Sequence, residues 1–511
     1  MTEAGVSLAA LVRAAAAQRP DAPAVVAGQE RLSWGELDAA VDRVAAGYAA
    51  LGLASGDRVA VQLPNGLAWL RAALGALRAG LVVVPVNTAY TDPELEYVLA
   101  DSGASLLVAV SDRTPVGGVR VIAGPPDGNG PPPAVTEDPV APAFLAYTSG
   151  TTGRPRGAIL TSAAMRANQE QCLSLTPPPV RADDRVLLVL PLFHVYGLNA
   201  GFGLVAATGA CAVLQETFDP RGSLALMAEE QVTAVPGAPP MYQAWLAAAD
   251  AAGNDAELRR GFAAMRMASS GAAPLPEEIW TAMRDRAAVT VWEGYGLTEA
   301  SPVVASTLAT GRAKPNCIGG PLPGVELQLR DTATTGSGEH AEDEEHLEGP
   351  GEIWLRGPNL FAGYWPDGAD GPDDDGWLGT GDLAYRDGDG DLHLVDRRSD
   401  LILVSGFNVY PAEVERVLDA HPAVVESAVI GVPDPRTGAA VRAVVVLAPG
   451  AEITFEALQE YAAQSLARYK VPTSVHFLPS LPHSLTGKVS RARLRDLGLT
   501  GSDTELEAAD D

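Results

Sequence analysis

The sequence predicts an α/β protein with a large N-terminal domain of doubly wound sheets and a small α+β C-terminal domain. Two observations support this prediction. Apolar runs that read as strands alternate with stretches of helical periodicity, a pattern typical of parallel βαβ units covered on both faces. The composition then changes near Asp396. Beyond that residue lies a segment of about 100 residues, which is long enough to fold by itself.

The N-terminal elements follow one another in order. Ser33 to Glu36 form a capping box, and apolar residues then recur at helical spacing as far as Gly52. Strands are predicted at 58–63, 81–86, 106–110, 143–146 and 158–160, and helices at 65–78 and after Thr91. Residues 125–142 are rich in Pro and Gly, which indicates a surface linker. The alternation resumes over 185–214 and 232–246.

The C-terminal part has its own series of elements. We predict strands at 401–404, 424–432 and 441–447 and helices at 412–420 and 454–466. Residues 331–351 are acidic and of low complexity, so we expect a mobile surface insertion there. The acidic end of the chain is expected to be disordered. The predicted domains are therefore 1–396 and 397–498, followed by a tail at 499–511.

Composition limits the possible partners. The 511 residues include 36 Lys and Arg against 64 Asp and Glu, giving a net charge of −28. This charge argues against nonspecific binding to nucleic acid or to anionic membranes, and a polyanionic ligand needs a local cluster of donors. No apolar run reaches the roughly 18 residues of a membrane span, and residues 1–20 make a poor signal peptide. Cys172, Cys211 and Cys317 have no metal-like spacing, so we expect reduced thiols in a cytoplasmic protein.

The stretch from Tyr147 to Gly157 carries the densest set of anion-binding groups. It contains three glycines, four Ser or Thr hydroxyls and two arginines in eleven residues. Glycines let successive N–H groups point at one anion, while hydroxyls and guanidiniums supply further donors. A plain turn also favours Gly, Ser and Thr, but two arginines fit a polyphosphate cradle better. No lysine follows the glycines, so the pattern is not GxxxxGK(S/T).

Lysine is rare in this chain. Only Lys314, Lys470 and Lys488 are lysines among the 36 basic residues, which suggests a coding bias toward arginine. A lysine that persists under such a bias is either a random survivor or a residue whose role a planar guanidinium cannot fill.

The 147–157 stretch resembles the phosphate loop of the adenylate-forming superfamily, which includes acyl-CoA synthetases, aryl-CoA ligases, luciferases and peptide-synthetase adenylation domains. Further motifs of that superfamily follow in the same order, and the resemblance spans about residues 5 to 498: Pro191–Gly197, Ser270–Pro274, Gly294–Glu299, Trp377–Asp382, Val395–Asp400, Ser405–Glu415 and Leu481–Lys488. Arg156 stands where the superfamily usually has lysine, and Ser399 where it has Asp or Lys. The resemblance also implies a β-barrel-like part in the large domain and a mobile C-terminal domain.

The resemblance implies a role for each motif residue. The residues expected to bind ATP or AMP are Thr148, Ser149, Gly150, Thr151, Thr152, Gly153, Arg156, Gly271, Ala272, Ala273, Glu293, Gly294, Tyr295, Gly296, Leu297, Thr298, Asp382, Arg397 and Lys488. Those expected to line the acyl pocket are His194, Val195, Tyr196, Gly271 and Gly296. Those expected to meet CoA are Ser405, Gly406 and Phe407, with the hinge at Ser399.

Three of these residues are expected to be catalytic. Glu299 is a hard oxygen ligand that suits Mg²⁺, with Thr148 as the second metal ligand. Thr298 is expected to donate to the α-phosphate, and Lys488 to follow negative charge as it develops in the transition state. Asp382, as an acceptor-only carboxylate, suits the ribose hydroxyls.

The implied activity is that of an acid–thiol ligase that uses ATP and Mg²⁺ to form an acyl-adenylate and then an acyl-CoA. The 396–411 stretch is most similar to bacterial fatty acyl-CoA synthetases, so a medium- or long-chain fatty acid is expected. Three alternatives stay open: an aryl-CoA ligase of the coumarate kind, an acyl-AMP ligase that loads an acyl carrier protein, and a nucleotide-binding protein that no longer adenylates. The expected partners are the acid, ATP and CoA, without nucleic acid or membrane; a homodimer stays open.

Overall fold

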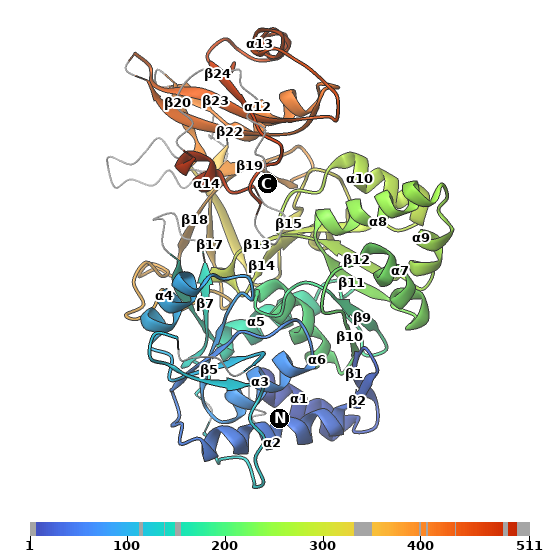
Figure 1. The fold of residues 1–511 in the computed structure, drawn as a ribbon, viewed down its shortest axis with the longest axis vertical. Helices are drawn as coiled ribbons and strands as arrows, with labels where there is room; N and C mark the ends of the chain where they lie inside the picture. The colour runs from blue at the N-terminus through green and yellow to red at the C-terminus, as the bar shows by residue number, and fades with distance from the viewer. Residues whose placement is uncertain are drawn as a thin grey trace. The chain divides into compact units, whose positions relative to one another are not determined.

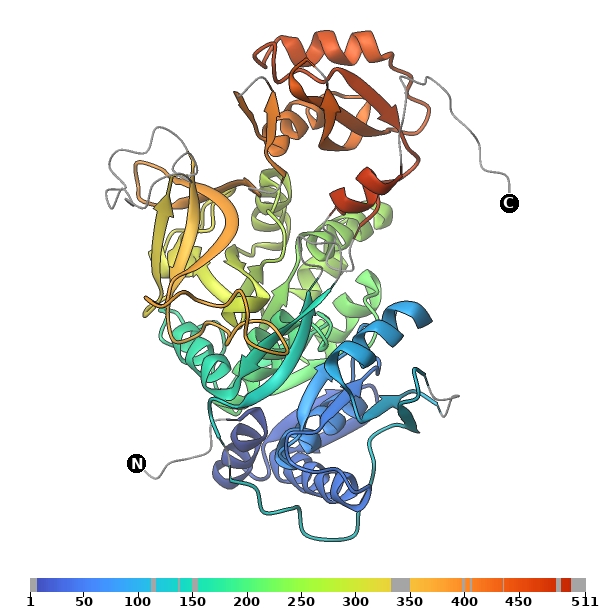
Figure 2. The same ribbon diagram turned by 90° about the vertical axis from the view of Figure 1, so that its left-hand side faces the viewer.

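The structure of this protein is a computed structural model, which describes residues 7–111, 116–136, 138–148, 155–331, 350–397, 400–404, 407–434, 436–483 and 489–497. The chain divides into two units. Unit 1 comprises Met1–Leu327 and Leu355–Leu378, and unit 2 comprises Gln328–Trp354 and Gly379–Asp511. Figure 1 and Figure 2 show the two units in two views. The predicted boundary at residue 396 stays a prediction.

The first sheet of unit 1 carries the glycine-rich loop. Its described strands run in the order β6-β5-β3-β4-β7-β8, with every neighbouring pair parallel except the final β7–β8 hairpin. Their bounds are β3 Arg58–Val61, β4 Val82–Pro85, β5 Leu106–Ala109, β6 Arg120–Ala123, β7 Pro142–Thr148 and β8 Arg156–Thr161. The helices of this part are α1 Leu8–Gln18, α2 Trp34–Ala50, α3 Leu67–Arg78 and α4 Asp92–Ser102.

The second sheet of unit 1 is larger. The described strands run in the order β15-β14-β13-β12-β11-β9-β10-β1-β2, parallel from β13 to β1 and antiparallel at both edges. The bounds are β1 Pro23–Ala27, β2 Glu30–Ser33, β9 Arg185–Leu188, β10 Cys211–Leu214, β11 Ala234–Gly237, β12 Met267–Ser270, β13 Val291–Gly296, β14 Val303–Ser306 and β15 Gly320–Pro321.

Helices accompany this second sheet along the chain. They are α5 Ser162–Leu173, α6 Leu204–Thr208, α7 Pro220–Glu229, α8 Pro239–Ala252, α9 Ala256–Gly261, α10 Glu277–Ala282 and α11 Thr307–Thr310. Helices α7 to α10 gather beside strands β9 to β12 in Figure 1. Two mostly parallel sheets with helices against them confirm the predicted α/β class of the large part.

Capping explains where the first helices begin. The Ser33 hydroxyl accepts from Glu36 N, and the Glu36 carboxylate accepts from Ser33 N, so the predicted capping box is confirmed. Thr91 and Glu94 form a second box ahead of α4, which ends at the left-handed Gly103. Each box satisfies backbone N–H groups that have no partner inside the helix.

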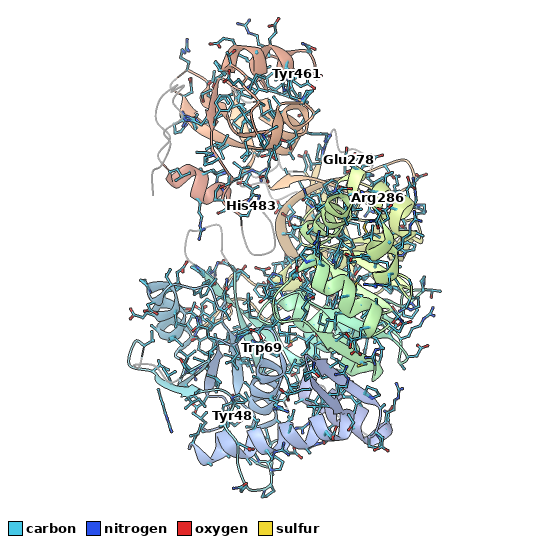
Figure 3. The ribbon with its side chains drawn as sticks, turned by 45° about the vertical axis from the view of Figure 1, so that its right-hand side comes forward. Tyr48, Trp69, Glu278, Arg286, Tyr461 and His483 are labelled. Atoms are coloured by element: carbon cyan, nitrogen blue, oxygen red, sulfur yellow. The ribbon has the colours of Figure 1, made fainter. Side chains whose placement is uncertain are left out.

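Large aromatic residues fill the core of unit 1. Trp34, Trp69 and Tyr48 are fully buried among the first three helices, and Figure 3 labels two of them. A second cluster surrounds Trp245, whose ring meets Phe262 edge-on at 5.2 Å while its indole N–H donates to Ser223. Cys172, Cys211 and Cys317 are all buried.

Unit 2 has its own sheet and core. The described strands run β21-β20-β23-β22, and β24 pairs with β23. The elements are β20 Ile402–Val404, β21 Phe407–Val409, α12 Pro411–Asp419, β22 Val424–Asp434, β23 Gly438–Leu447, α13 Phe455–Ala463, β24 Ser474–Phe477 and α14 Arg491–Asp496. Val414, Leu418 and Leu458 are fully buried against this sheet. The predicted α+β C-terminal part is therefore confirmed.

A further sheet of the described residues has four strands. Its described strands are β16 Glu326–Arg330, β17 Gly351–Arg356, β18 Leu378–Arg386 and β19 Leu392–Arg397, in that order. The acidic segment predicted to be mobile falls mostly outside the described residues, as does the acidic tail after 497.

Candidate active site

The β7–β8 hairpin holds the two ends of the glycine-rich loop. Thr148 pairs with Arg156 in the antiparallel register, so these two residues face each other across the hairpin. The loop residues Ser149, Gly150, Thr151, Thr152 and Gly153 lie outside the described residues. The described structure therefore fixes where the predicted phosphate loop leaves and re-enters the sheet.

Arg156 is held by two contacts at the start of β8. Its guanidinium lies over the ring of Tyr364, 3.9 Å from the centroid, and one of its nitrogens lies 2.8 Å from the Asp370 carboxylate. The Asp370 side chain is 71% exposed, so this ion pair is screened by water and easily exchanged for another anion. The Arg156 guanidinium is therefore positioned mainly by the Tyr364 ring.

Glu299 belongs to the same group of side chains. The Tyr364 hydroxyl donates to Glu299 Oε1 at 2.6 Å, a short charge-assisted hydrogen bond. Through Tyr364 the structure therefore brings Glu299 near Arg156, which pairs with Thr148, although Glu299 lies more than 140 residues further along the chain. Carboxylate and hydroxyl oxygens are the ligands that Mg²⁺ prefers, so Glu299 and Thr148 fit the metal that the sequence implies.

A tight turn between β13 and β14 presents Thr298 and Glu299. Gly296 allows the turn, since a Cβ at that position would lie 2.3 Å from the backbone oxygen of Pro302. Leu297 N donates to Pro302 O, and the short 3₁₀ helix Thr298–Ala300 follows. Tyr295, which was expected to stack on a purine, is buried at 7% exposure, and that role stays a prediction.

Buried amide side chains clamp this turn from three segments of unit 1. Asn199 donates to Ser301 O at 2.6 Å, Asn359 donates to Ala300 O at 2.9 Å, and Asn168 donates to Val303 O at 2.7 Å. Removing any of these donors would leave a buried carbonyl without its partner, which costs about 1–3 kcal/mol. The position of Glu299 is therefore set by several independent hydrogen bonds.

The loop after β12 lies beside the next strand, β13. Ala272 takes the left-handed conformation with a φ of 71°, which non-glycine residues adopt only under constraint. The Glu293 carboxylate supplies part of that constraint, because its Oε1 accepts from Leu275 N at 3.3 Å. Glu293 is 4% exposed and its Oε2 has no partner. Burial accordingly raises the pKa of this carboxyl to about 8.

Three of the predicted acyl-binding residues, His194, Tyr196 and Gly271, lie close together, whereas Gly296 lies against Pro302. Gly197 permits a sharp entry into the π-helix Tyr196–Gly203, since a Cβ there would lie 2.4 Å from Pro191 O. The Tyr196 hydroxyl donates to Gly237 O at 3.2 Å, and a Cβ on Gly271 would lie 3.2 Å from the Tyr196 ring. The phenol ring thus occupies the space between the π-helix and β12. The sequence predicted only an alternation of strands and helices over 185–214, and the π-helix at this position was not predicted.

His194 is part of the same group. Its Nδ1 accepts from Tyr196 N at 3.2 Å, and desolvation lowers the pKa of its imidazole. The ring is therefore neutral at pH 7 and holds its proton on Nε2 when Nδ1 accepts. This bond fixes the His194 ring against the backbone of Tyr196. Burial raises the pKa of the Tyr196 phenol to about 12.

In unit 2 the two predicted ribose contacts occur as a pair. Asp382 and Arg397 are opposite residues of the antiparallel β18–β19 ladder, and the Asp382 side chain is 8% exposed. Phe407 begins β21. The predicted hinge Ser399, the CoA-loop residues Ser405 and Gly406, and Lys488 lie outside the described residues.

A second acidic group in unit 2 is best explained as a turn. Asp387, Asp389 and Asp391 could together offer ligand atoms to a metal. However, one oxygen of Asp387 accepts from the backbone N–H groups of Asp389 and Asp391, and the other lies 2.8 Å from His393 Nε2. These bonds are those of a capped hairpin turn.

Sequence reasoning missed Tyr364, Asp370 and the three clamping asparagines. The run Phe361–Trp365 is conspicuous for its aromatic residues, but its partner strand β8 lies about 200 residues earlier, and such pairing cannot be read from one sequence. The asparagine side chains donate to backbone oxygens. Because every residue has a backbone oxygen, the sequence does not show which one is the partner.

The fold and the described motifs define an AMP-binding, adenylate-forming enzyme. A family model described as AMP-binding enzyme matches residues 12–365, and one described as AMP-binding enzyme C-terminal domain matches residues 413–488. The chain belongs to this family and is an AMP-forming acid–CoA ligase, which confirms the resemblance read from the motifs. No helix in the described residues is long and apolar enough to cross a membrane.

Particular relatives cover nearly the whole chain. It is 39% identical to a feruloyl-CoA synthase of an Amycolatopsis species, covering 93% of this chain and 96% of the relative. It is 35% identical to a long-chain-fatty-acid–CoA ligase of Yersinia pestis, covering 96% and 94%. Among solved structures, ATP-bound MatB from Rhodopseudomonas palustris matches with a TM-score of 0.85 and 31% identity, over 96% of this chain and 98% of that one.

One prediction follows from the buried Glu293. The unfolded chain releases this proton near pH 4.5, whereas the folded protein keeps it until about pH 8, so stability falls as the pH rises through this window. Glu293→Gln cannot ionise and keeps an acceptor for Leu275. The variant should gain stability over the unaltered protein from pH 5 to pH 8, by a few kcal/mol in order of magnitude. Melting temperatures across this range measure the gain.

A matched control is Glu230→Gln. Glu230 is buried like Glu293, but it pairs with Arg31 and Arg185, so its replacement should destabilise the protein at neutral pH. A stability difference between Glu293→Gln and the unaltered protein that does not change with pH would contradict the prediction.

Proposed function

We propose that this acid–CoA ligase activates a planar aromatic acid, of the arylpropenoic class, with ATP and transfers it to CoA. The observation that supports this proposal is the position of the Tyr196 side chain. Its ring packs on Gly271, and its hydroxyl donates to Gly237 O. An acyl chain that ran between the π-helix and β12 would have to displace this ring. A flat ring can instead stack against the phenol without displacing it. The 39% identical feruloyl-CoA synthase supports the same acid class.

The reaction has two halves. A carboxylate oxygen attacks the α-phosphorus of ATP, the bond to the pyrophosphate oxygen breaks, and acyl-AMP forms. The CoA sulfur then attacks the acyl carbon, the bond to AMP breaks, and the thiol proton is released. Both halves need fixed donors where negative charge develops.

The described residues suit these tasks. Arg156 would bind the departing phosphates in place of the exposed Asp370, and the Thr298 hydroxyl would donate to the α-phosphate. Glu299 and Thr148 would hold Mg²⁺, which neutralises phosphate charge when bound. Neutral His194, held by Tyr196 N, would form part of the acid pocket. Asp382 and Arg397 would bind the ribose in unit 2.

The residues outside the described ranges complete the proposal. Lys488 would bridge the acid and the α-phosphate in the first half. Rotation of the C-terminal domain about Ser399 would then withdraw this lysine and bring Ser405, Gly406 and Phe407 to CoA, so that one site serves two transition states.

A second candidate substrate is the medium- or long-chain fatty acid expected from the sequence. The 35% identity to a long-chain-fatty-acid–CoA ligase supports it. ATP–pyrophosphate exchange with ferulate, coumarate and saturated acids of increasing length separates the candidates. Exchange that rises with chain length and is absent with aromatic acids would contradict our proposal. Formation of acyl-CoA with CoA as sole acceptor separates both from a ligase that loads a carrier protein.

A substitution at Tyr196 tests the pocket directly. Tyr196→Ala removes the ring from Gly271 and opens the space to an aliphatic tail. We expect the ratio of exchange with octanoate and longer acids to exchange with aromatic acids to rise about tenfold. Tyr196→Phe keeps the ring and serves as the control, with the preference for aromatic acids retained. An unchanged acid profile in Tyr196→Ala would contradict this pocket assignment.

The division of labour between the two half-reactions gives another test. Lys488→Ala should abolish pyrophosphate exchange and yet spare thioester formation from synthetic acyl-adenylate, because only the first half would use this ammonium. Mass spectrometry of the acyl-CoA product measures the second half. Equal loss of both halves would overturn the assignment of Lys488.

A further inference from the structure

Residues 361–371 form a segment that packs on β8. Ala362 N donates to Ile159 O and Ile159 N donates to Gly363 O, both at 3.0 Å, and Trp365 N donates to Gly157 O at 2.8 Å. Tyr364 itself pairs with Ala158 as an antiparallel bridge. The segment lies beside α4 at the left of Figure 1, where the Trp365 indole donates to Asp101 O. It is thus attached to the strand that begins with Arg156.

The backbone of this segment is confined on both sides of Tyr364. Gly363 has a φ of 97°, and a Cβ there would lie 2.0 Å from Gly368 O, so no other residue fits. Tyr364 N donates to Ala369 O, and Gly368 N donates to Tyr364 O at 2.7 Å. At the other end, Phe361 N donates to Glu299 O at 2.8 Å. The backbone from which the Tyr364 side chain extends is therefore held in place.

Two charged residues, Glu299 and Arg156, contact the Tyr364 side chain. The hydroxyl donates to Glu299 Oε1 at 2.6 Å, and the Arg156 guanidinium lies 3.9 Å from the ring centroid. Phe361 packs edge-on against the same ring at 5.0 Å, which limits its rotation.

We propose that Tyr364 is a positioning residue of the ATP site: its hydroxyl orients the Glu299 carboxylate, and its ring supports the Arg156 guanidinium. This inference rests on the proposed function, in which Glu299 holds Mg²⁺ and Arg156 binds phosphate. One phenol on a rigid backbone then sets the spacing between a cation-binding carboxylate and an anion-binding cation. The Glu299 carboxylate keeps free lone pairs for the metal after accepting this bond.

The test is Tyr364→Phe, which removes the hydroxyl and leaves the ring beneath Arg156. Binding of ATP is measured by calorimetry in Mg²⁺ and in EDTA. We expect the Kd of MgATP to rise about tenfold, the typical effect of losing a hydrogen bond to a charged group, while the Kd of metal-free ATP is unchanged. The KM for the acid should also be unchanged. A purely structural role would weaken both forms of ATP alike.

Two further proteins make the test specific. Tyr48→Phe removes a buried hydroxyl that donates to Ala72 O, far from this group, and should leave both Kd values unaltered. In a Glu299→Gln background, Tyr364→Phe should add less than a twofold change, because the carboxylate through which it acts is gone.

The possible results distinguish a failure of this inference from a failure of the proposed function. Unaltered MgATP binding in Tyr364→Phe, or a tenfold loss that persists in the Glu299→Gln background, would overturn the inference alone. Absence of ATP–pyrophosphate exchange by the unaltered protein with every acid would overturn the proposed function, and the inference with it.

Discussion

The pairing of β8 on two sides is the constraint on which the site depends. One edge of β8 pairs with β7 and so fixes the ends of the glycine-rich loop, with Thr148 opposite Arg156. Its other edge binds the backbone of residues 362–365, which brings Tyr364 to Arg156 and Glu299. A shift of this register by one residue would turn Tyr364 to the opposite face and separate the three side chains.

The charges close to the site differ from the charge of the protein as a whole, which would repel a polyphosphate substrate. The chain carries a net charge of −28, which repels ATP at long range. Within unit 1, Glu293 keeps its proton at pH 7 because it is buried, so the loop beside β12 gains no negative charge from it. The exposed Asp370 neutralises Arg156 only through a solvent-screened pair. The acidic residues near the site thus interfere little with phosphate binding.

Local patterns made much of the fold predictable. The capping boxes at Ser33 and Thr91, the alternation of apolar strands and helices, and the composition change near Asp396 depend on neighbours in sequence. The motif order was enough to identify the family and to place Thr148, Arg156, Thr298 and Glu299 in one expected site.

What escaped prediction depends on contacts between distant segments. Tyr364 reaches the site only because its segment pairs with β8. The side chains of Asn199, Asn168 and Asn359 each donate to a turn that lies more than 50 residues away in the sequence. The Tyr196–Gly271 contact likewise joins two segments that are far apart in the sequence, and it favours an aromatic acid over the aliphatic acid expected from the sequence. The loop at 149–154 and Lys488 keep their roles as predictions, since the structure does not describe them.

In the proposed function, Thr148, Arg156, Thr298 and Glu299 form one MgATP site in unit 1. A crystal structure of the protein with Mg²⁺ and a non-reactive acyl-sulfamoyl-adenosine plus pyrophosphate tests it most directly. We expect a metal bound to the Glu299 carboxylate, with the sulfamoyl group within hydrogen-bond distance of the Thr298 hydroxyl. A nucleotide bound elsewhere, with the metal on the Asp387, Asp389 and Asp391 turn instead, would contradict it.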